Sequence, residues 1–443
     1  MSDTVLGLLP DTPAGRQLAW WVGALAGAGD GVEPGDAVRF GPELRERMAP
    51  LFAPETLRET WARDAGRFGR PVELSVETDE PTNIVAVMGT DKDRRWTLTL
   101  AVEAEPPHVI TTFAIARVHA FQLEVREAGL ADALTVADIE TRCPIVMGDV
   151  AVWFDRGDRY FDAMRLMEDF TVGLASVDGV PAAISCGSEH VVRVGGALKK
   201  LVTVSHLRVL PEHQRKGLWG AANSVLQKYW PHVDGSQAYI SVDNLGMQHG
   251  FEGTPDKWPQ TVQRLQLDCA ALAGPAVGRP ATPADADVIV ERLNAFHGDE
   301  ELFVPYTAES LAARLERASD LYTWDKIRMT DGAQVGAWPA GRALKTVTDT
   351  GGVQTVCNPA VVVDYACEPG AEAELEALLR AWCGMLAPAG IDTLVIYTSP
   401  ASPAAPRLTA LARDVGAFFT WTPGIPVPEG AEQRGLYTDA VYF

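Results

Sequence analysis

The chain of 443 residues predicts a mixed α+β and α/β protein, with an N-terminal α+β cone followed by two domains built on mixed β-sheets. Three observations support this fold class. The chain is too long for one ordinary core, so two to four domains are expected. Strand patterns and helix patterns recur along the whole sequence. Residues 201–230 run from a buried strand through a short basic turn into a helical pattern, as α/β units do.

The composition is that of a folded, acidic protein. Apolar residues make up 47 % and charged residues 22 %, which is typical of globular chains. The formal net charge of −21 would repel nucleic acid and anionic membranes, so neither is expected as a partner. Six scattered cysteines show neither metal-binding nor disulfide spacing, and neither a leader peptide nor an apolar run of spanning length is evident. We expect a cytoplasmic protein with no metal site.

Residues 1–118 are expected to form the cone. Thr12 and Pro13 suit the N-cap and the first position of a helix. The helices and strands expected after it are Pro42–Phe52, Pro54–Phe68, Val72–Glu77, Asn83–Met88, Trp96–Glu103 and Val109–Val118. Three helices and then a four-stranded meander suggest a curved sheet around the first helix. This order resembles the cystatin-like, nuclear-transport-factor-like fold, which implies an accessory packing role. Its exposed sheet favours a homodimer.

The stretch Leu201–Trp230 carries the strongest functional signal. Its first nine residues are mostly β-branched or apolar and predict a buried strand, and residues 217–230 have helical spacing. The turn at residues 214–220 reads QRKGLWG. Backbone N–H groups and the positive end of the helix dipole at such a turn favour an anion, most often a phosphate. Gly217 would let the anion approach the backbone. An ordinary β–turn–α unit is the alternative.

The same residues resemble motif A of the GNAT acyltransferases. The matching residues are Val209, Pro211, Gln214 and Gly217, whereas Trp219 stands where the family has a small residue. The resemblance implies that a coenzyme A pyrophosphate lies at the turn and that its pantetheine arm pairs with the end of the strand. The implied cofactor is acetyl-CoA or another acyl-CoA. The implied contacts are Leu207, Arg208, Val209, Gln214, Arg215, Lys216, Gly217, Leu218, Trp219, Gly220 and Asn244.

Residues 119–275 suit one complete GNAT domain around this stretch. The expected strands are Phe121–Arg126, Phe170–Val177, Pro181–Val194, Leu201–Val209 and Gln237–Val242, and the expected helices are Leu130–Thr141, Asp158–Met167 and Gly217–Trp230. The last two strands would lie parallel, because a helix connects them as a crossover. The resemblance implies that these two strands splay apart around the pantetheine arm.

The implied chemistry is acyl transfer from the thioester to a small amine. The enzyme must remove a proton, stabilise an oxyanion and position both substrates. Base candidates on the strands are Glu189, His190 and His206. Alternation from Val209 points His206 away from the expected site, although a bulge could re-aim it. Residues 243–251 resemble the family's closing segment but lack its proton-donating tyrosine, which leaves His249 as a candidate. A structural role is the alternative for all four.

Residues 276–443 repeat the plan after a Gly/Pro-rich joint at residues 274–280. The expected elements are a helix around residues 288–296, Ser310–Arg317, Leu321–Thr330, Gln334–Trp338, Val361–Cys367, Glu372–Met385, Thr393–Tyr397 and a last strand Leu436–Phe443. Three carboxylates, Glu368, Glu372 and Glu374, stand where the phosphate turn would be and would repel a pyrophosphate. This degenerate copy resembles the second domain of tandem GNAT proteins such as mycothiol synthase. We expect this domain to form one side of the acceptor pocket, and we expect its last strand to complete a sheet across the domain boundary.

Three classes of function follow from these residues. The first is a coenzyme-A-dependent N-acyltransferase, most simply an acetyltransferase, acting on a small amine. The second is a non-catalytic acyl-CoA-binding protein, which Trp219 and the missing tyrosine favour. The third is different chemistry, either O-acyl transfer on the same fold or a hydrolase or isomerase activity in the cone.

Overall fold

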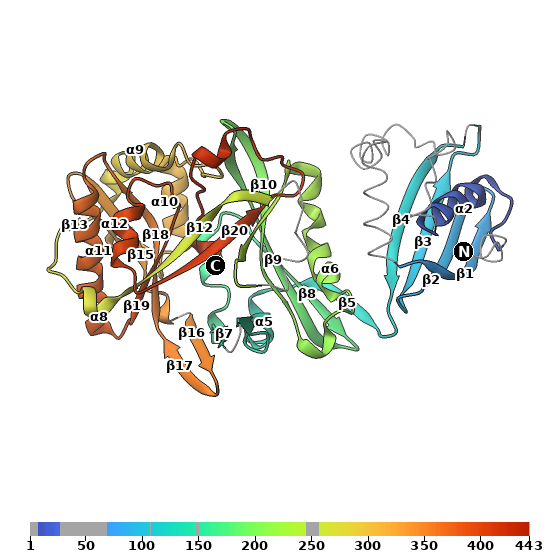
Figure 1. The fold of residues 1–443 in the computed structure, drawn as a ribbon, viewed down its shortest axis with the longest axis horizontal. Helices are drawn as coiled ribbons and strands as arrows, with labels where there is room; N and C mark the ends of the chain where they lie inside the picture. Colours follow the sequence, from blue (N-terminus) through green and yellow to red (C-terminus); the bar gives the residue numbers. More distant parts are fainter. Residues whose placement is uncertain are drawn as a thin grey trace. The chain divides into compact units, whose positions relative to one another are not determined.

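The computed structural model describes residues 8–26, 69–106, 108–147, 150–244, 257–342 and 344–442. The chain divides into two compact units, Met1–Gln122 and Leu123–Phe443 (Figure 1). The predicted helices Pro42–Phe52 and Pro54–Phe68 lie outside the described residues.

The first unit packs one helix on an antiparallel meander. Its elements are α2 (Pro13–Ala26), β1 (Pro71–Glu80), β2 (Asn83–Thr90), β3 (Arg95–Val102) and β4 (Ile110–Val118). The strands pair in chain order, which confirms the four predicted strands. The Gly15 N–H donates to Thr12 Oγ1 over 3.1 Å, so Thr12 caps α2 as predicted. Leu18 and Val22 of α2 are fully buried in the core above the sheet.

One sheet of twelve strands runs through the second unit. Its order is β13 (Arg279–Pro280), β14 (Ile327–Met329), β15 (Ala333–Trp338), β18 (Pro359–Cys367), β19 (Thr393–Thr398), β12 (Lys257–Asp268), β20 (Asp414–Trp421), β11 (Gly235–Ser241), β10 (Ala197–Val209), β9 (Val180–Val194), β8 (Thr171–Val177) and β5 (Leu123–Glu127). In Figure 1, β12 and β20 run through the middle, between the β8–β10 side and the β15–β18 side.

Strands β12 and β20 merge two half-sheets into one. β12 follows the first half in sequence but pairs with β19 of the second, and β20 comes from the second half but pairs with β11 of the first. A smaller sheet also joins the halves in the order β17 (Val353–Cys357), β16 (Lys345–Thr350), β7 (Val150–Asp155) and β6 (Ile145–Met147). The two halves therefore share a continuous backbone hydrogen-bond network.

Helices cover the large sheet. They are α5 (Ala133–Thr141), α6 (Leu218–Asn223), α8 (Cys269–Leu272), α9 (Ala286–His297), α10 (Ala308–Arg317), α11 (Glu372–Leu386) and α12 (Ala405–Leu411). Short 3₁₀ turns, η3 (Gly157–Arg159) and η4 (Ala163–Leu166), follow α5, and η6 (Ser224–Lys228) follows α6. No helix among the described residues is long and apolar enough to span a membrane.

Three predicted elements differ from the structure. The helix Gly217–Trp230 is α-helical only over α6, because the Ser224 hydroxyl donates to the Ala221 carbonyl over 2.7 Å and the chain tightens into η6. The helix Asp158–Met167 is replaced by η3 and η4. The predicted strand Leu321–Thr330 is confined to β14.

The predicted last strand Leu436–Phe443 is also wrong over its described part. Residues 436–442 form a buried irregular segment that ends in a 3₁₀ turn, Ala440–Tyr442. Its backbone N–H groups donate to the side chain of Ser399 and to the backbone of Glu301, so the segment does not pair as a strand with the large sheet. The strand that completes the sheet across the boundary is β20.

Candidate functional site

β10 and β11 pair only at their beginnings. Three parallel pairs join them, and the last is Thr203 with Gln237. Beyond that pair β10 continues to Val209 with β9 on its other side, and β11 continues to Ser241 with β20 on its other side. We call the opening between residues 204–209 and 238–241 the first fork. Its two facing edges present backbone N–H and C=O groups that no described strand pairs with.

A bulge lies in β10 beside the first fork. The pairing of β10 with β9 shifts register between Ser205 and Arg208, and His206 has a φ of +48°. Strict alternation would place His206 with Val202 and Val204, which pack against η6. Instead the bulge turns His206 toward α5 on the opposite face of the sheet. A non-glycine residue held in the left-handed region is typical of functional sites.

His206 belongs to a buried charged cluster behind the bulge. Arg156 Nε donates to Glu140 Oε2 over 2.8 Å, and His206 Nδ1 lies 3.4 Å from Glu140 Oε1. The Tyr160 ring meets the His206 ring edge-on at 5.6 Å. Burial alone would raise the pKa of Glu140, but Arg156, His206 and Arg208 hold it at about 2. Burial lowers the pKa of His206 despite the nearby carboxylate, so this cluster holds a charged Glu140 and a neutral imidazole.

His190 lies in a second polar cluster at the base of the first fork. Its Nε2 is 3.2 Å from Thr203 Oγ1 and 3.0 Å from Gln237 Nε2, and Gln237 also donates to Thr203 Oγ1 over 2.6 Å. Its Nδ1 is 3.2 Å from the Ser188 carbonyl. Burial lowers the pKa of His190 to about 4, so the ring is neutral near pH 7.

Replacing His190 with glutamine is expected to flatten the acid dependence of stability. The unfolded chain protonates this histidine near pH 6.5, whereas the folded chain does so only near pH 4. The free energy of unfolding of the wild-type protein should therefore fall by up to about 3 kcal/mol as the pH drops from 6.5 to 4, and the variant should lack this part of the fall. Urea midpoints at pH 7 and pH 4.5 measure this difference. The exposed His232→Gln variant should keep the wild-type pH dependence, and an unchanged slope in His190→Gln would contradict the prediction.

The turn after β10 presents backbone toward solvent. Arg215 has a φ of +62° and Gly217 a φ of +86°, so two residues of the turn are left-handed. Gly217 is the N-cap residue of α6, and its conformation is one that a side chain would strain. Lys216 Nζ lies 3.3 Å from His213 Nδ1. Gln214, Trp219 and Gly220 are exposed, Leu218 is buried, and α6 approaches β8 closely because a side chain at Gly173 would collide with the Ala222 carbonyl.

The remaining predicted residues lie apart from these clusters or outside the described chain. Glu189 forms an ion pair with Lys200 at 2.5 Å, and its neighbours on β9, Ser188 and His190, point to the other face. Asn244 is half-buried just beyond β11. His249 lies outside the described residues.

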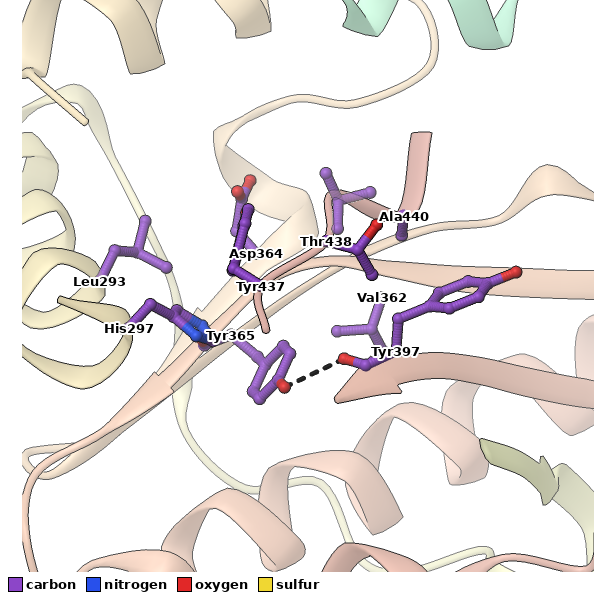
Figure 2. Close-up of a pocket in the computed structure, with 10 residues that line it drawn as sticks. Leu293, His297, Val362, Asp364, Tyr365, Tyr397, Tyr437, Thr438 and Ala440 are labelled. Carbon is purple, nitrogen blue, oxygen red and sulfur yellow. Dashed lines mark hydrogen bonds between the residues drawn. The ribbon is translucent and has the colours of Figure 1, made fainter. Parts of the chain in front are cut away.

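A second fork repeats the geometry of the first. β18 and β19 pair in parallel over three residues, ending at Val361 with Val395, and then separate. We call the opening after that pair the second fork. Figure 2 shows Tyr437, Thr438 and Ala440 lying in it, above Val362 and Tyr397. The remaining cavity is about 10 Å³, room for about one water molecule.

Sequence reasoning missed the partners in these clusters. Glu140 and Arg156 are 16 residues apart, and both are buried despite their charges. Tyr442, which contacts His190, lies at the far end of the chain. A charged residue on a helix looks like a solvated residue until its partner is known, so only the fold brings these groups together. Among the described residues, no cluster of three or more acidic, His or Cys side chains could hold a metal ion.

Comparison with known proteins shows the fold. No protein-family model matches the chain, and no curated protein matches it in sequence. The structure of Saccharomyces cerevisiae N-myristoyltransferase with bound myristoyl-CoA matches with a TM-score of 0.53 at 11 % identity, covering 76 % of this chain and 92 % of that chain. A GCN5-related N-acetyltransferase from Sphaerobacter thermophilus matches with a TM-score of 0.44 at 15 % identity, covering 70 % and 98 %. The first match supports the predicted GNAT-like mixed α/β fold.

Proposed function

We propose that this chain is an acyl-CoA-dependent N-acyltransferase that transfers an acyl group, most simply acetyl, to a small amine. The first fork is the observation that carries the proposal. Two strands of one sheet separate after Thr203 and Gln237 and leave two facing edges. An extended amide-containing arm can pair with such an edge as an added strand does. The shared fold with N-myristoyltransferase, whose structure holds myristoyl-CoA, supports the same cofactor class.

The turn at residues 214–220 would hold the phosphates of the cofactor. It follows β10 directly, and its left-handed residues, Arg215 and Gly217, present backbone that an anion can approach. Arg215 and Lys216 also add positive charge on a chain whose net charge is −21. The cofactor contacts within this proposal are residues 207–209, 214–220 and Asn244.

Among the described base candidates, His190 is the one that we place at the reacting centre. It is neutral and lies at the base of the first fork, beside Thr203 and Gln237. Glu189 is engaged by Lys200, and His206 is held beside Glu140. We therefore give His206 a positioning role: it would fix the bulge in β10, whose backbone N–H groups would stabilise the thioester oxygen.

The double variant Lys216→Glu, Gly217→Asp is expected to weaken acetyl-CoA binding at least about 10-fold. It reverses one charge beside the phosphates and forces a side chain onto a residue with a φ of +86°. Calorimetric titration with acetyl-CoA measures the dissociation constant. The control is Lys228→Glu, a charge reversal on η6 at a surface ion pair with Glu127. Equal affinities of wild type and the double variant would refute the cofactor site.

The release of free thiol from acetyl-CoA tests whether the protein catalyses acyl transfer. Acetyl-CoA is incubated with the protein and a panel of small amines, and free thiol is followed over time. Release that depends on an amine supports N-acyl transfer, and release that depends on an alcohol supports O-acyl transfer. Tight binding without release would favour the non-catalytic acyl-CoA-binding protein.

We also propose a role for each of the three parts of the chain. Residues 1–118 form an accessory cone of the cystatin-like kind that packs or dimerises. Residues 119–275 hold the cofactor, and residues 276–443 are a degenerate copy whose fork is filled by its own chain. A cytoplasmic location belongs to the same proposal. Deleting residues 1–118 should leave thiol release intact, and its loss would place the chemistry in the cone.

A further inference from the structure

The segment Leu436–Tyr442 fills the second fork with the protein's own chain. All seven residues are buried, although the segment is irregular. The Leu436 N–H donates to Ser399 Oγ over 3.2 Å, and the Tyr437 N–H donates to the Glu301 carbonyl over 2.9 Å. Tyr437 and Thr438 thus lie in the place that, in the first fork, we assign to the cofactor arm (Figure 2).

A buried ion pair holds this segment in place. Arg314 of α10 donates to both carboxylate oxygens of Asp439, over 2.9 and 2.7 Å. The same guanidinium donates to Tyr306 Oη over 2.7 Å and lies 3.4 Å from Asp364 Oδ1. The two carboxylates and the guanidinium are each at most 10 % exposed. We call the Arg314–Asp439 pair the latch.

The end of the segment reaches the first fork. The Tyr442 ring lies 5.1 Å from the His190 ring and stacks on Tyr239 of β11 at 6.5 Å. The His190 ring that Tyr442 contacts lies with its Nε2 3.2 Å from Thr203 Oγ1, and Thr203 is the residue of β10 at which the first fork opens. A tyrosine from the second half therefore stands at the base of the fork in the first half.

We propose that Tyr442 donates the proton to the thiolate that leaves during acyl transfer, and that the latch positions it. The inference rests on the proposed function. The amine nitrogen bonds to the acyl carbon, the carbon–sulfur bond breaks, and its electron pair goes to sulfur. The Tyr442 hydroxyl gives that sulfur its proton, His190 takes a proton from the acylated amine, and solvent carries a proton from His190 back to Tyr442. The products are an amide and free coenzyme A thiol.

Two further observations fit this role. The closing segment of the first half, residues 243–251, contains no tyrosine. Burial, and next the nearby Asp439, raise the pKa of Tyr442 well above its ordinary value, so the hydroxyl keeps its proton over the working pH range. Tyr239 is a weaker choice, because its hydroxyl is directed to the Tyr437 carbonyl at 3.4 Å.

Tyr442→Phe is expected to lower kcat about 100-fold with acetyl-CoA as donor, with the dissociation constant of acetyl-CoA unchanged. The control is Tyr365→Phe, a buried tyrosine of the second fork whose hydroxyl donates to the Tyr397 carbonyl over 3.0 Å. Its kcat should change less than about 3-fold. If Tyr442→Phe retains wild-type kcat, or if Tyr365→Phe falls as far, Tyr442 is not the donor.

A second acyl donor with a different leaving group distinguishes proton donation by Tyr442 from a purely structural role. An aromatic thiolate needs no proton to leave, so with the acetyl thioester of an aromatic thiol the loss in Tyr442→Phe should shrink to less than about 3-fold. A purely structural role would lower turnover of both donors equally and would overturn the proposal. Asp439→Asn, which keeps the shape of the latch, should reproduce the loss of kcat without weakening acetyl-CoA binding.

Failure of this inference is distinguishable from failure of the proposed function. A wild-type protein that neither binds acetyl-CoA nor releases thiol refutes both. A wild-type protein that binds and turns over, with a fully active Tyr442→Phe variant, refutes only the assignment of Tyr442.

Discussion

Replacing Arg314 with methionine should lower the free energy of unfolding of the Leu123–Phe443 unit by about 3–5 kcal/mol. The change leaves Asp439 and Asp364 buried without their shared counter-charge. It also deprives Tyr306 of the 2.7 Å hydrogen bond that its oxygen accepts. The free-energy cost of leaving a buried charge without its partner is larger than the stabilisation from the apolar contacts that methionine keeps, so the net effect is destabilising.

Urea denaturation followed by tryptophan fluorescence measures this loss. The control is Arg380→Met, which breaks the i,i+4 pair with Glu376 at 38 % and 21 % exposure. That variant should lose less than about 1 kcal/mol. Adding Asp439→Asn to Arg314→Met should recover part of the stability, because one of the stranded charges is removed. A loss in Arg314→Met no larger than in the control would show that the latch does not stabilise the fold.

Replacing Arg156 with methionine should cost a similar amount, about 3–5 kcal/mol, and should also impair turnover. Arg156 and Glu140 are 2 % and 1 % exposed, so Glu140 would be left almost fully buried with only His206 and Arg208 near it. Without Arg156, burial would raise the pKa of Glu140 from its present value of about 2. Without its bond to Arg156, Glu140 would no longer hold His206 in the same way, so the bulge in β10 should shift.

The same ion pair makes the wild-type protein acid-sensitive. A carboxylate whose pKa is depressed in the folded state stabilises the fold above its unfolded pKa of about 4.5 and loses that contribution as the pH falls toward 2. Arg156→Met should remove this part of the acid dependence. The control Arg126→Met breaks an ion pair with Asp132 in which the arginine is 56 % exposed, and it should cost less than about 1 kcal/mol. A similar loss in both variants would contradict the account.

Sequence patterns over a few residues predicted the elements whose structure depends mainly on neighbouring residues, namely strands and a helix cap. The strands around Leu201–Val209 and the cap at Thr12 follow from the pattern of apolar residues and from side-chain hydrogen bonding. The bulge at His206 was foreseen only as a way to re-aim that side chain. The structure contains it, and the glycine at 217 has the left-handed conformation that its turn requires.

The connection between the halves was not predictable in the same way. Residues 257–268 and 414–421 become the central strands β12 and β20 because each pairs with the other half, and pairing between distant segments leaves no local pattern. The latch joins residues 125 apart in the chain. The segment Leu436–Tyr442 looks like a strand because it is apolar, but its hydrogen bonds go to side chains and loops.

Amide hydrogen exchange with and without acetyl-CoA tests the central claim most directly, namely that an acyl-CoA lies along the open edge of β10. The two forks provide an internal comparison, because Tyr437 and Thr438 lie in the second one, whereas no described strand pairs with the facing edges of the first. Saturating acetyl-CoA should slow exchange in peptides that cover residues 204–209, and should leave residues 362–366 of β18 unchanged. Unchanged exchange at residues 204–209, or protection confined to β18, would contradict the account.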